Sequence, residues 1–313
     1  MHPSPQVAVL IPCYNEAVAI GSVVRDFRAA LPEAAIYVYD NNSSDDTVAV
    51  ARQAGAVVRQ EMLQGKGHVI RRMFADIDAD FYVLVDGDDT YDAATAPLMV
   101  ERAVTGGLDM VNGLRVTEIQ AAYRPGHRLG NRVLTGLVGG IFGNRVTDML
   151  SGYRVFSRRF VKSFPALSSG FETETEFTVH ALELRMAVAE VPTRYKDRPV
   201  GSTSKLRTYS DGARILRTIV LLVKEERPLA FFASLAALLA LLALLLGTPV
   251  VLDYVQTGLV PRLPTAVLST GLMLLAALAT ACGLILDSVT RGRRELKRLH
   301  YLSIPAPPRQ DQP

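Results

Sequence analysis

The chain has 313 residues and a formal net charge of +3, and 49% of its residues are hydrophobic. This length allows one large or two modest domains, and so small a charge gives no support to a nucleic-acid partner. The two cysteines, Cys13 and Cys282, have neither the spacing of a metal site nor a plausible disulfide pairing, so both are expected to be structural.

Short apolar runs alternate with helical patterns through the first 114 residues. We expect strands at 7–11, 35–39, around Val57, 81–85 and 110–114, and helices over 20–31, 48–54, 65–76 and 95–104. This alternation predicts an α/β sandwich around a mostly parallel sheet. No Gly-x-Gly-x-x-Gly and no P-loop follows the first strand, which excludes a dinucleotide-binding sheet and a P-loop enzyme.

Polar clusters follow three of these strands, at residues 12–16, 40–46 and 86–89. Such sheets bind ligands at the carboxyl ends of their strands, so the three clusters predict a binding crevice along one edge. In the third cluster, Asp86, Asp88 and Asp89 would repel one another unless a cation lay among them. Hard oxygen ligands suit Mg²⁺ or Mn²⁺, which often bind substrate phosphates too. The alternative is an acidic turn that caps the next helix.

Two uncharged apolar runs lie near the C-terminus, at 229–252 and 265–286. Each is long enough to cross a hydrocarbon core of about 30 Å, so transmembrane helices are expected over 229–252 and 265–287. Basic residues flank the pair, whereas the connection between the runs contains only Arg262. This asymmetry predicts a hairpin with both termini in the cytoplasm, and the chain start lacks a signal-peptide core.

The expected organisation is a catalytic domain over 1–207, an amphipathic juxtamembrane helix over 208–228, the two spans, and a basic then proline-rich cytoplasmic tail over 288–313. The juxtamembrane segment alternates apolar and basic residues as a helix lying on a membrane does. It would place the mouth of the site at the lipid surface.

Five segments in order resemble family-2 glycosyltransferases with the GT-A fold, in the branch of dolichyl-phosphate mannose synthases and bacterial undecaprenyl-phosphate sugar transferases. They are Pro-Cys-Tyr-Asn-Glu at 12–16, Asp-Asn-Asn-Ser-Ser-Asp-Asp-Thr at 40–47, Asp-Gly-Asp at 86–88, Ser-Gly-Tyr-Arg-Val-Phe-Ser at 151–157 and Tyr-Lys-Asp-Arg-Pro-Val-Gly-Ser-Thr-Ser-Lys at 195–205. The resemblance implies inverting transfer of a sugar from a UDP- or GDP-linked donor to polyprenyl phosphate. It also implies a divalent metal, a membrane location and a chain that is compatible with homo-oligomers.

The resemblance also implies roles for individual residues. The expected donor-binding residues are Pro12, Tyr14, Glu16, Asp40, Asn42, Lys66 and Asp86. The expected catalytic residues are Asp86, Asp88, Arg198 and Lys205, and the acceptor phosphate is expected at Arg115, Arg128 and Arg132. Some family members have Gln where this chain has Thr90, which leaves Asp89 as a substitute metal contact beside Asp86 and Asp88.

A phosphate acceptor is already ionised at neutral pH and needs no general base, whereas a hydroxyl acceptor would need one. The acidic run of Glu172, Glu174 and Glu176 could supply such a base, although a structural or orienting role is favoured. Arg154 is expected to anchor Asp148.

Two other functions stay open. One is transfer to a hydroxyl of a glycolipid or polysaccharide, although processive relatives carry Gln-x-x-Arg-Trp and this chain has no Trp. The other is a non-catalytic membrane scaffold that binds nucleotide sugars. The sequence does not distinguish among donor sugars.

Overall fold

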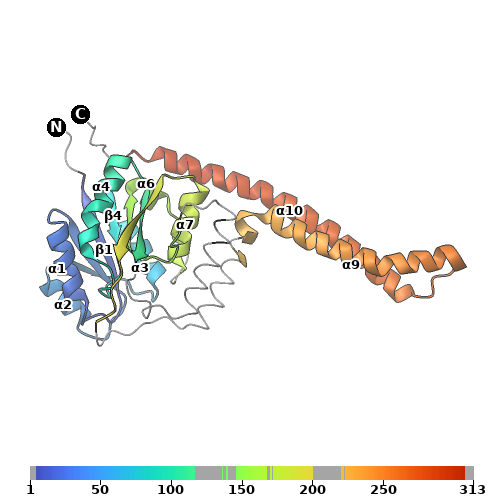
Figure 1. Ribbon diagram of the computed structural model, residues 1–313, viewed down its shortest axis with the longest axis horizontal. Helices are drawn as coiled ribbons and strands as arrows, with labels where there is room; N and C mark the ends of the chain where they lie inside the picture. The colour runs from blue at the N-terminus through green and yellow to red at the C-terminus, as the bar shows by residue number, and fades with distance from the viewer. Residues whose placement is uncertain are drawn as a thin grey trace. The chain divides into compact units, whose positions relative to one another are not determined.

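The computed structural model describes residues 5–116, 136, 139, 146–167, 170, 172–199, 220, 221 and 223–306. The chain divides into two compact units, one of Met1–Ile215 with Lys297–Pro313 and one of Leu216–Leu296. The first contains the β-sheet and is called the sheet unit; the second contains most of two long helices and is called the helical unit (Figure 1).

The sheet unit is built on seven strands in the order β3-β2-β1-β4-β6-β5-β7. Only β6 runs antiparallel to its neighbours among these strands; the other pairings are parallel. The mostly parallel sheet confirms the predicted fold class. The strands are β1 (Val7–Cys13), β2 (Ala35–Asp40), β3 (Val57–Gln60), β4 (Phe81–Leu84), β5 (Met110–Val116), β6 (Arg154–Ser157) and β7 (Val188–Arg194).

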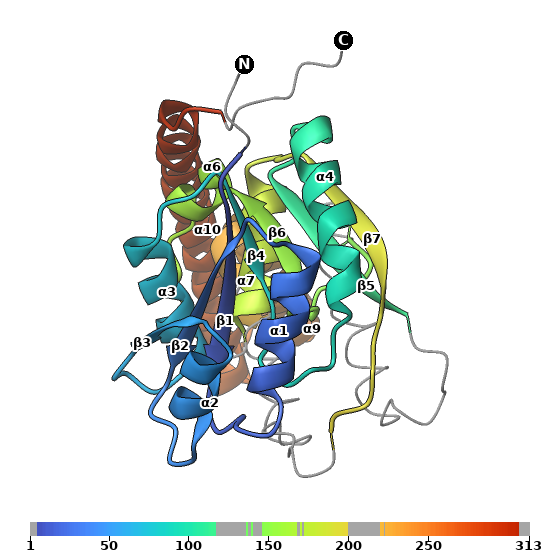
Figure 2. The same ribbon diagram turned by 90° about the vertical axis from the view of Figure 1, so that its left-hand side faces the viewer.

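Helices cover both faces of this sheet (Figure 2). On one face lie α1 (Ile20–Ala30), α2 (Thr47–Gln53) and α4 (Ala96–Gly106), the last preceded by a short 3-10 helix, Ala93–Thr95; on the other lie α3 (Lys66–Asp76), α6 (Arg158–Ser163) and α7 (Thr173–Glu183). Alternation along the strands explains the two cores, since neighbouring side chains point to opposite faces. Val83 and Val155 join the aliphatic core under α1 and α4, while Phe156 packs among aromatic rings of α3, α6 and α7.

Every strand and helix predicted for the first 114 residues overlaps an observed element. The acidic run at 172–176 lies at the start of α7, so it is helical rather than extended. Cys13 and Cys282 are both free thiols, as expected.

His180 on α7 lies inside the aromatic core. Its ring meets Phe160 and Phe164 edge-on at centroid distances of 5.3 and 5.4 Å, and its Nε2 lies 3.1 Å from Ser163 Oγ. Its Nδ1 has no hydrogen-bond partner among the residues that the structure describes. Burial, with a smaller contribution from the Lys297 charge, lowers the pKa of His180 to about 3.

This buried histidine predicts a loss of stability in mild acid. The pKa of His180 is lower in the folded than in the unfolded state, so the protein takes up a proton when it unfolds below pH 6.5. The contribution of neutral His180 to stability is therefore complete only above the unfolded pKa of about 6.5. Between pH 6.5 and 5 the free energy of unfolding should fall by about 2 kcal/mol from this group. Urea unfolding of the full-length protein in detergent should show this slope in the wild type and in His68→Gln, a control at a partly exposed histidine. The slope should shrink in His180→Phe, and an unchanged slope there would assign the acid sensitivity to other groups.

The helical unit contains α9 (Pro228–Thr257) and most of α10 (Leu263–Ser303), which run alongside each other (Figure 1). Small side chains form their contact, with Ala236, Ala276 and Ala279 buried together and Ser269 Oγ donating to Ala243 O at 2.8 Å. Both helices are long and apolar enough to cross a membrane, and few of their side chains are buried. The predicted spans lie within them, whereas most of the predicted juxtamembrane helix lies outside the described residues.

The last turns of α10 belong to the sheet unit. Lys297 Nζ lies 2.7 Å from Glu183 Oε2 on α7, and the Tyr301 hydroxyl donates to Asp109 Oδ2 at 2.8 Å. Part of the predicted basic tail is therefore the helical end of α10, and residues from Lys297 onward belong to the sheet unit.

Candidate functional site

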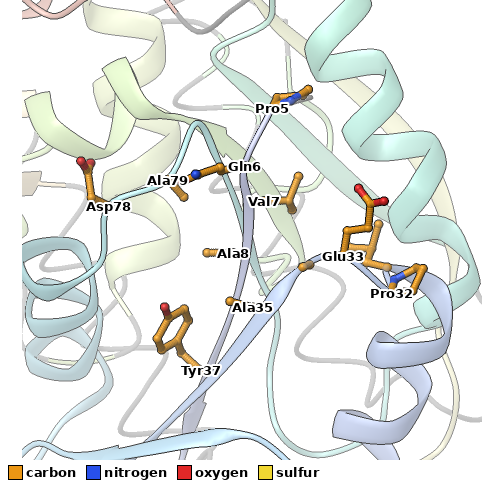
Figure 3. A pocket seen from close by; sticks show the side chains of 12 residues that line it. Pro5, Gln6, Val7, Ala8, Pro32, Glu33, Ala35, Tyr37, Asp78 and Ala79 are labelled. Carbon is orange, nitrogen blue, oxygen red and sulfur yellow. The ribbon is translucent and has the colours of Figure 1, made fainter. Parts of the chain in front are cut away.

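The three predicted polar clusters do share one edge of the sheet. Cys13 at the end of β1 pairs with Asp40 at the end of β2, and Leu10 pairs with Leu84, so Asp86 follows β4 at the same edge. A pocket of about 560 Å³ lies elsewhere, where β1 and β2 begin, against Gln6, Tyr37 and Asp78 (Figure 3). The candidate site is therefore the carboxyl edge, as ligand binding to such sheets requires.

Glycines allow the backbone to approach closely around Asp86. A Cβ on Gly87 would lie 2.5 Å from Cys13 Sγ, so any larger residue there would force the Cys13 side chain or the segment itself to move. A Cβ on Gly152 would collide with the Asp86 carboxylate. The Ser-Gly-Tyr-Arg segment thus forms one wall of the Asp86 site, which spacing in the sequence does not reveal.

Asp88 is a buried carboxylate with two partners. The Thr90 hydroxyl donates to its Oδ1 at 2.6 Å, and Arg198 Nη2 lies 2.6 Å from its Oδ2. Burial first, and then the charge of Asp86, raise the pKa of Asp88 despite the opposing charge of Arg198. Thr90 therefore orients Asp88, and the carboxylate lies in surroundings that favour additional positive charge.

Asp86 pairs with a buried lysine. Lys66 Nζ at the start of α3 lies 2.5 Å from Asp86 Oδ1 and also 2.5 Å from Glu174 Oε1 on α7. Burial alone would lower the pKa of Lys66, but the two carboxylates outweigh it and raise that pKa, so the ammonium stays charged. The predicted donor residue Lys66 thus joins Asp86 to Glu174, a member of the acidic run for which an orienting role was favoured.

The structure does not bring the predicted metal trio together. Asp89 adopts φ +56° and its carboxylate pairs with Lys196 Nζ at 3.2 Å. Among the described residues, no three His, Cys, Asp or Glu side chains converge as ligands of one ion. Asp86 and Asp88 remain the two carboxylates that could hold a divalent metal, and Mg²⁺ is often bound by one or two carboxylates together with substrate phosphates and water.

The second strand end presents an unpaired acceptor. Asp40 is 1% exposed, its Oδ2 accepts the Ser43 amide at 3.1 Å, and its Oδ1 has no hydrogen-bond partner within the described part of the chain. A buried acceptor without a partner is costly, so a ligand N–H would stabilise it. Nearby, Glu16 is buried, Pro12 is half-buried and Tyr14 is 39% exposed.

The side chain of Asn42 binds the adjoining loop. Its Nδ2 donates to Met62 O at 2.9 Å and to Gln64 Oε1 at 3.3 Å. Its φ of +64° is a conformation that asparagine tolerates better than most residues. This predicted donor residue therefore shapes the segment that leads into Lys66.

The predicted phosphate-binding arginines fall into two groups. Arg115 grips Asp148 with Nε and Nη2, each at 2.7 Å from a carboxylate oxygen. Burial would raise the pKa of Asp148, but Arg115 outweighs it and the pKa lies below its usual value. Arg128 and Arg132 lie outside the described residues, as does Lys205.

Arg154 was expected to anchor Asp148, but the side chain that binds this carboxylate directly is Arg115, and Arg154 acts on Asp148 through its charge. Arg154 is fully buried and instead donates to the carbonyls of Ser151 and Met149, at 3.0 and 2.6 Å, and to Thr178 Oγ1 at 2.9 Å. It ties the Ser-Gly-Tyr-Arg segment to α7, next to Asp86.

Comparison with known proteins fits this arrangement. The sequence profile of glycosyl transferase family 2 matches residues 8–164, half of the chain. The chain belongs to this family. The glycosyltransferase AglJ of Haloferax volcanii is 33% identical over 308 residues, covering 96% of this chain and 99% of AglJ. A dolichyl-phosphate hexose transferase of the same organism is 30% identical over 221 residues, covering 71% of this chain and 95% of that protein.

A solved structure supports the fold of this family 2 glycosyltransferase. Glucosyl-3-phosphoglycerate synthase from Mycobacterium tuberculosis, in complex with Mn²⁺, UDP-glucose and phosphoglyceric acid, superposes with a TM-score of 0.57. The match covers 71% of this chain and 79% of that one at 23% identity, so it concerns the fold alone. The sheet unit is therefore a GT-A-like domain.

Proposed function

We propose that this family 2 glycosyltransferase inverts the anomeric centre while transferring a sugar from a nucleotide sugar to polyprenyl phosphate. The observation that carries the proposal is that one chain joins the Asp86 and Asp88 site to two helices apolar enough to cross a membrane. The likeness to a protein named dolichyl-phosphate hexose transferase supports the choice of a lipid phosphate as acceptor.

The strand-end residues would bind the donor. Asp40 would accept an N–H of the nucleobase at its unpaired Oδ1, beside Pro12, Tyr14, Glu16 and Asn42. Asp86 and Asp88 would hold a Mg²⁺ or Mn²⁺ ion against the diphosphate. When bound, such an ion neutralises the charge that grows on the leaving nucleoside diphosphate.

The transfer step needs no proton movement from the acceptor. An ionised phosphate oxygen of the lipid attacks the anomeric carbon, and the bond from that carbon to the donor diphosphate breaks with its electron pair leaving on the nucleoside diphosphate. Arg198, already beside Asp88, would share the neutralisation of that charge. We assign Arg115, Arg128 and Arg132 to the acceptor phosphate and Lys205 to the diphosphate.

The proposed location is a membrane with the sheet unit and both termini on the cytoplasmic side. Lys224 and Arg227 precede α9 closely, and five basic residues lie at 291–298, against only Arg262 between the helices. Excess Lys and Arg marks the cytoplasmic side. The lipid chain would stay in the bilayer while its phosphate reaches the site.

A donor panel tests this function. The detergent-purified protein is incubated with Mg²⁺ or Mn²⁺, undecaprenyl phosphate and each radiolabelled UDP- or GDP-sugar, and the lipid phase is extracted. We expect label in an acid-labile, organic-soluble product with one donor. If label moved only to diacylglycerol or to a sugar hydroxyl, the proposed polyprenyl-phosphate acceptor would be wrong. Donor binding without transfer to any acceptor would favour a non-catalytic scaffold.

A further inference from the structure

Lys66 is shared by two carboxylates that come from distant parts of the chain. Its ammonium lies 2.5 Å from Asp86 after β4 and 2.5 Å from Glu174 on α7, and 10% of the lysine side chain is exposed. Asp86 is the most exposed of these three side chains, at 29%, and Glu174 is the most buried, at 6%. Lysine geometry allows both contacts at once because the ammonium has three donors.

Glu174 has no other visible reason to be charged and buried. Its Oε2 has no hydrogen-bond partner within the described residues, and its Oε1 is paired with Lys66. Burying a carboxylate is costly unless a partner compensates it. Burying the Lys66–Glu174 pair therefore costs free energy. The pair lies next to Asp86, which the proposed function assigns to the metal.

The position of Lys66 creates a competition for Asp86. A divalent ion and the Lys66 ammonium both seek the Asp86 carboxylate, and a lysine bound to Asp86 alone would weaken metal binding. A second carboxylate at the same distance from the ammonium shares it with Asp86 and keeps it within the site. This division of one cation between two carboxylates is the distinctive feature of the cluster.

We propose that Glu174 is a positioning residue that holds Lys66 so that Asp86 remains available to the metal and the ammonium remains beside the donor diphosphate. The proposal rests on the proposed function, in which Asp86 and Asp88 hold the metal. Glu174 itself touches neither metal nor donor; it acts through Lys66. Because Glu174 acts through Lys66, substituting Glu174 should change metal binding only while Lys66 is present, whereas a simple charge effect would not depend on Lys66.

A double-mutant cycle on Mn²⁺ affinity provides the test. The full-length protein in detergent is titrated with Mn²⁺ alone, without nucleotide sugar or acceptor, and free Mn²⁺ is followed by electron paramagnetic resonance. We expect Lys66→Met to bind Mn²⁺ about tenfold more tightly and Glu174→Gln about tenfold more weakly, within the range of couplings between contacting residues. Because Glu174 acts through Lys66, the double variant should match Lys66→Met.

A purely long-range effect of charge predicts a different result. The two changes would then add, and the double variant would return to wild-type affinity, which would overturn the positioning role. Glu183→Gln is the matched control, since Glu183 lies on the same helix, has 3% of its side chain exposed and pairs with a lysine, Lys297. It should leave Mn²⁺ affinity unchanged, and an equal loss there would also overturn the proposal.

Two further measurements keep the result unambiguous. If Glu174→Gln does not fold, Glu174→Asp keeps the charge but shortens the side chain and so loosens its contact with Lys66. The resulting weakening of Mn²⁺ affinity should disappear in the Lys66→Met background. If the wild type shows no Mn²⁺ site that Asp86→Ala removes, the metal part of the proposed function fails. Additivity with an intact metal site contradicts only the role of Glu174.

Discussion

Asp88→Asn is expected to lower the rate of sugar transfer by about 10²- to 10³-fold, the loss typical of removing one preorganised electrostatic group. The substitution keeps the size of the side chain and an oxygen that can accept from the Thr90 hydroxyl. It removes the charge that a divalent ion requires and that Arg198 pairs with. The fold should survive, because the Arg198 side chain is 28% exposed and water can solvate its guanidinium once the Asp88 charge is gone.

Initial rates with the donor that the panel identifies, measured over a range of Mn²⁺ concentrations, check this expectation. Asp92→Asn is the matched control, because Asp92 lies four residues away and caps the next helix by accepting the Ala94 amide at 3.0 Å. Asparagine caps nearly as well as aspartate, so that variant should retain wild-type activity. A rate for Asp88→Asn within threefold of the control would remove Asp88 from the proposed metal site.

Arg154→Met is expected to destabilise the sheet unit by about 3 to 5 kcal/mol, as breaking a buried charged network usually does. The guanidinium is fully buried and satisfies two carbonyls and a hydroxyl, and it lies over the Phe177 ring at 5.6 Å. Burial lowers the pKa of Arg154 to about 10, so the group is charged at neutral pH. Methionine fills part of the space but leaves the three acceptors unpaired.

Denaturant unfolding in detergent, followed by far-ultraviolet circular dichroism, measures this loss of stability. Arg158→Met is the control four residues later, where the arginine pairs with Asp78 on the surface and both side chains are well exposed, 40% and 61%. Its effect should stay below about 1 kcal/mol, the usual limit for exposed pairs. Equal effects of the two substitutions would show that the Arg154 network adds no stability.

The sequence predicted the shared edge of the strand ends because the pattern that marks it is local. Strand ends marked by Pro12, Asp40 and Asp86 are readable in one pass, and the parallel register places them at one edge. Apolar runs such as β1 and β4 are buried on both faces, which makes them distinct from the amphipathic helices between them.

Other parts of the site were not predictable because their partners are far apart in the chain. Lys66 and Glu174 are 108 residues apart, and Arg115 and Asp148 are 33 residues apart. Nothing in periodicity pairs such charges. Arg154 also lies in a short strand, where a fully buried arginine runs against the usual pattern of burial, so its role became visible only with its acceptors in place.

The position of β6 bears on how the nascent chain acquires this sheet. β4 and β5 do not touch directly, because β6, which is made later, lies between them. At synthesis rates of about 5 to 20 residues per second, β4 is complete several seconds before β6 emerges. During that interval the edge of a wholly apolar strand has no native neighbour on one side, which is the kind of surface that chaperones bind and that aggregation exploits. The segment that closes this edge also brings Gly152 to Asp86, so the same late-made part of the chain covers the edge of β4 and forms one wall of the Asp86 site.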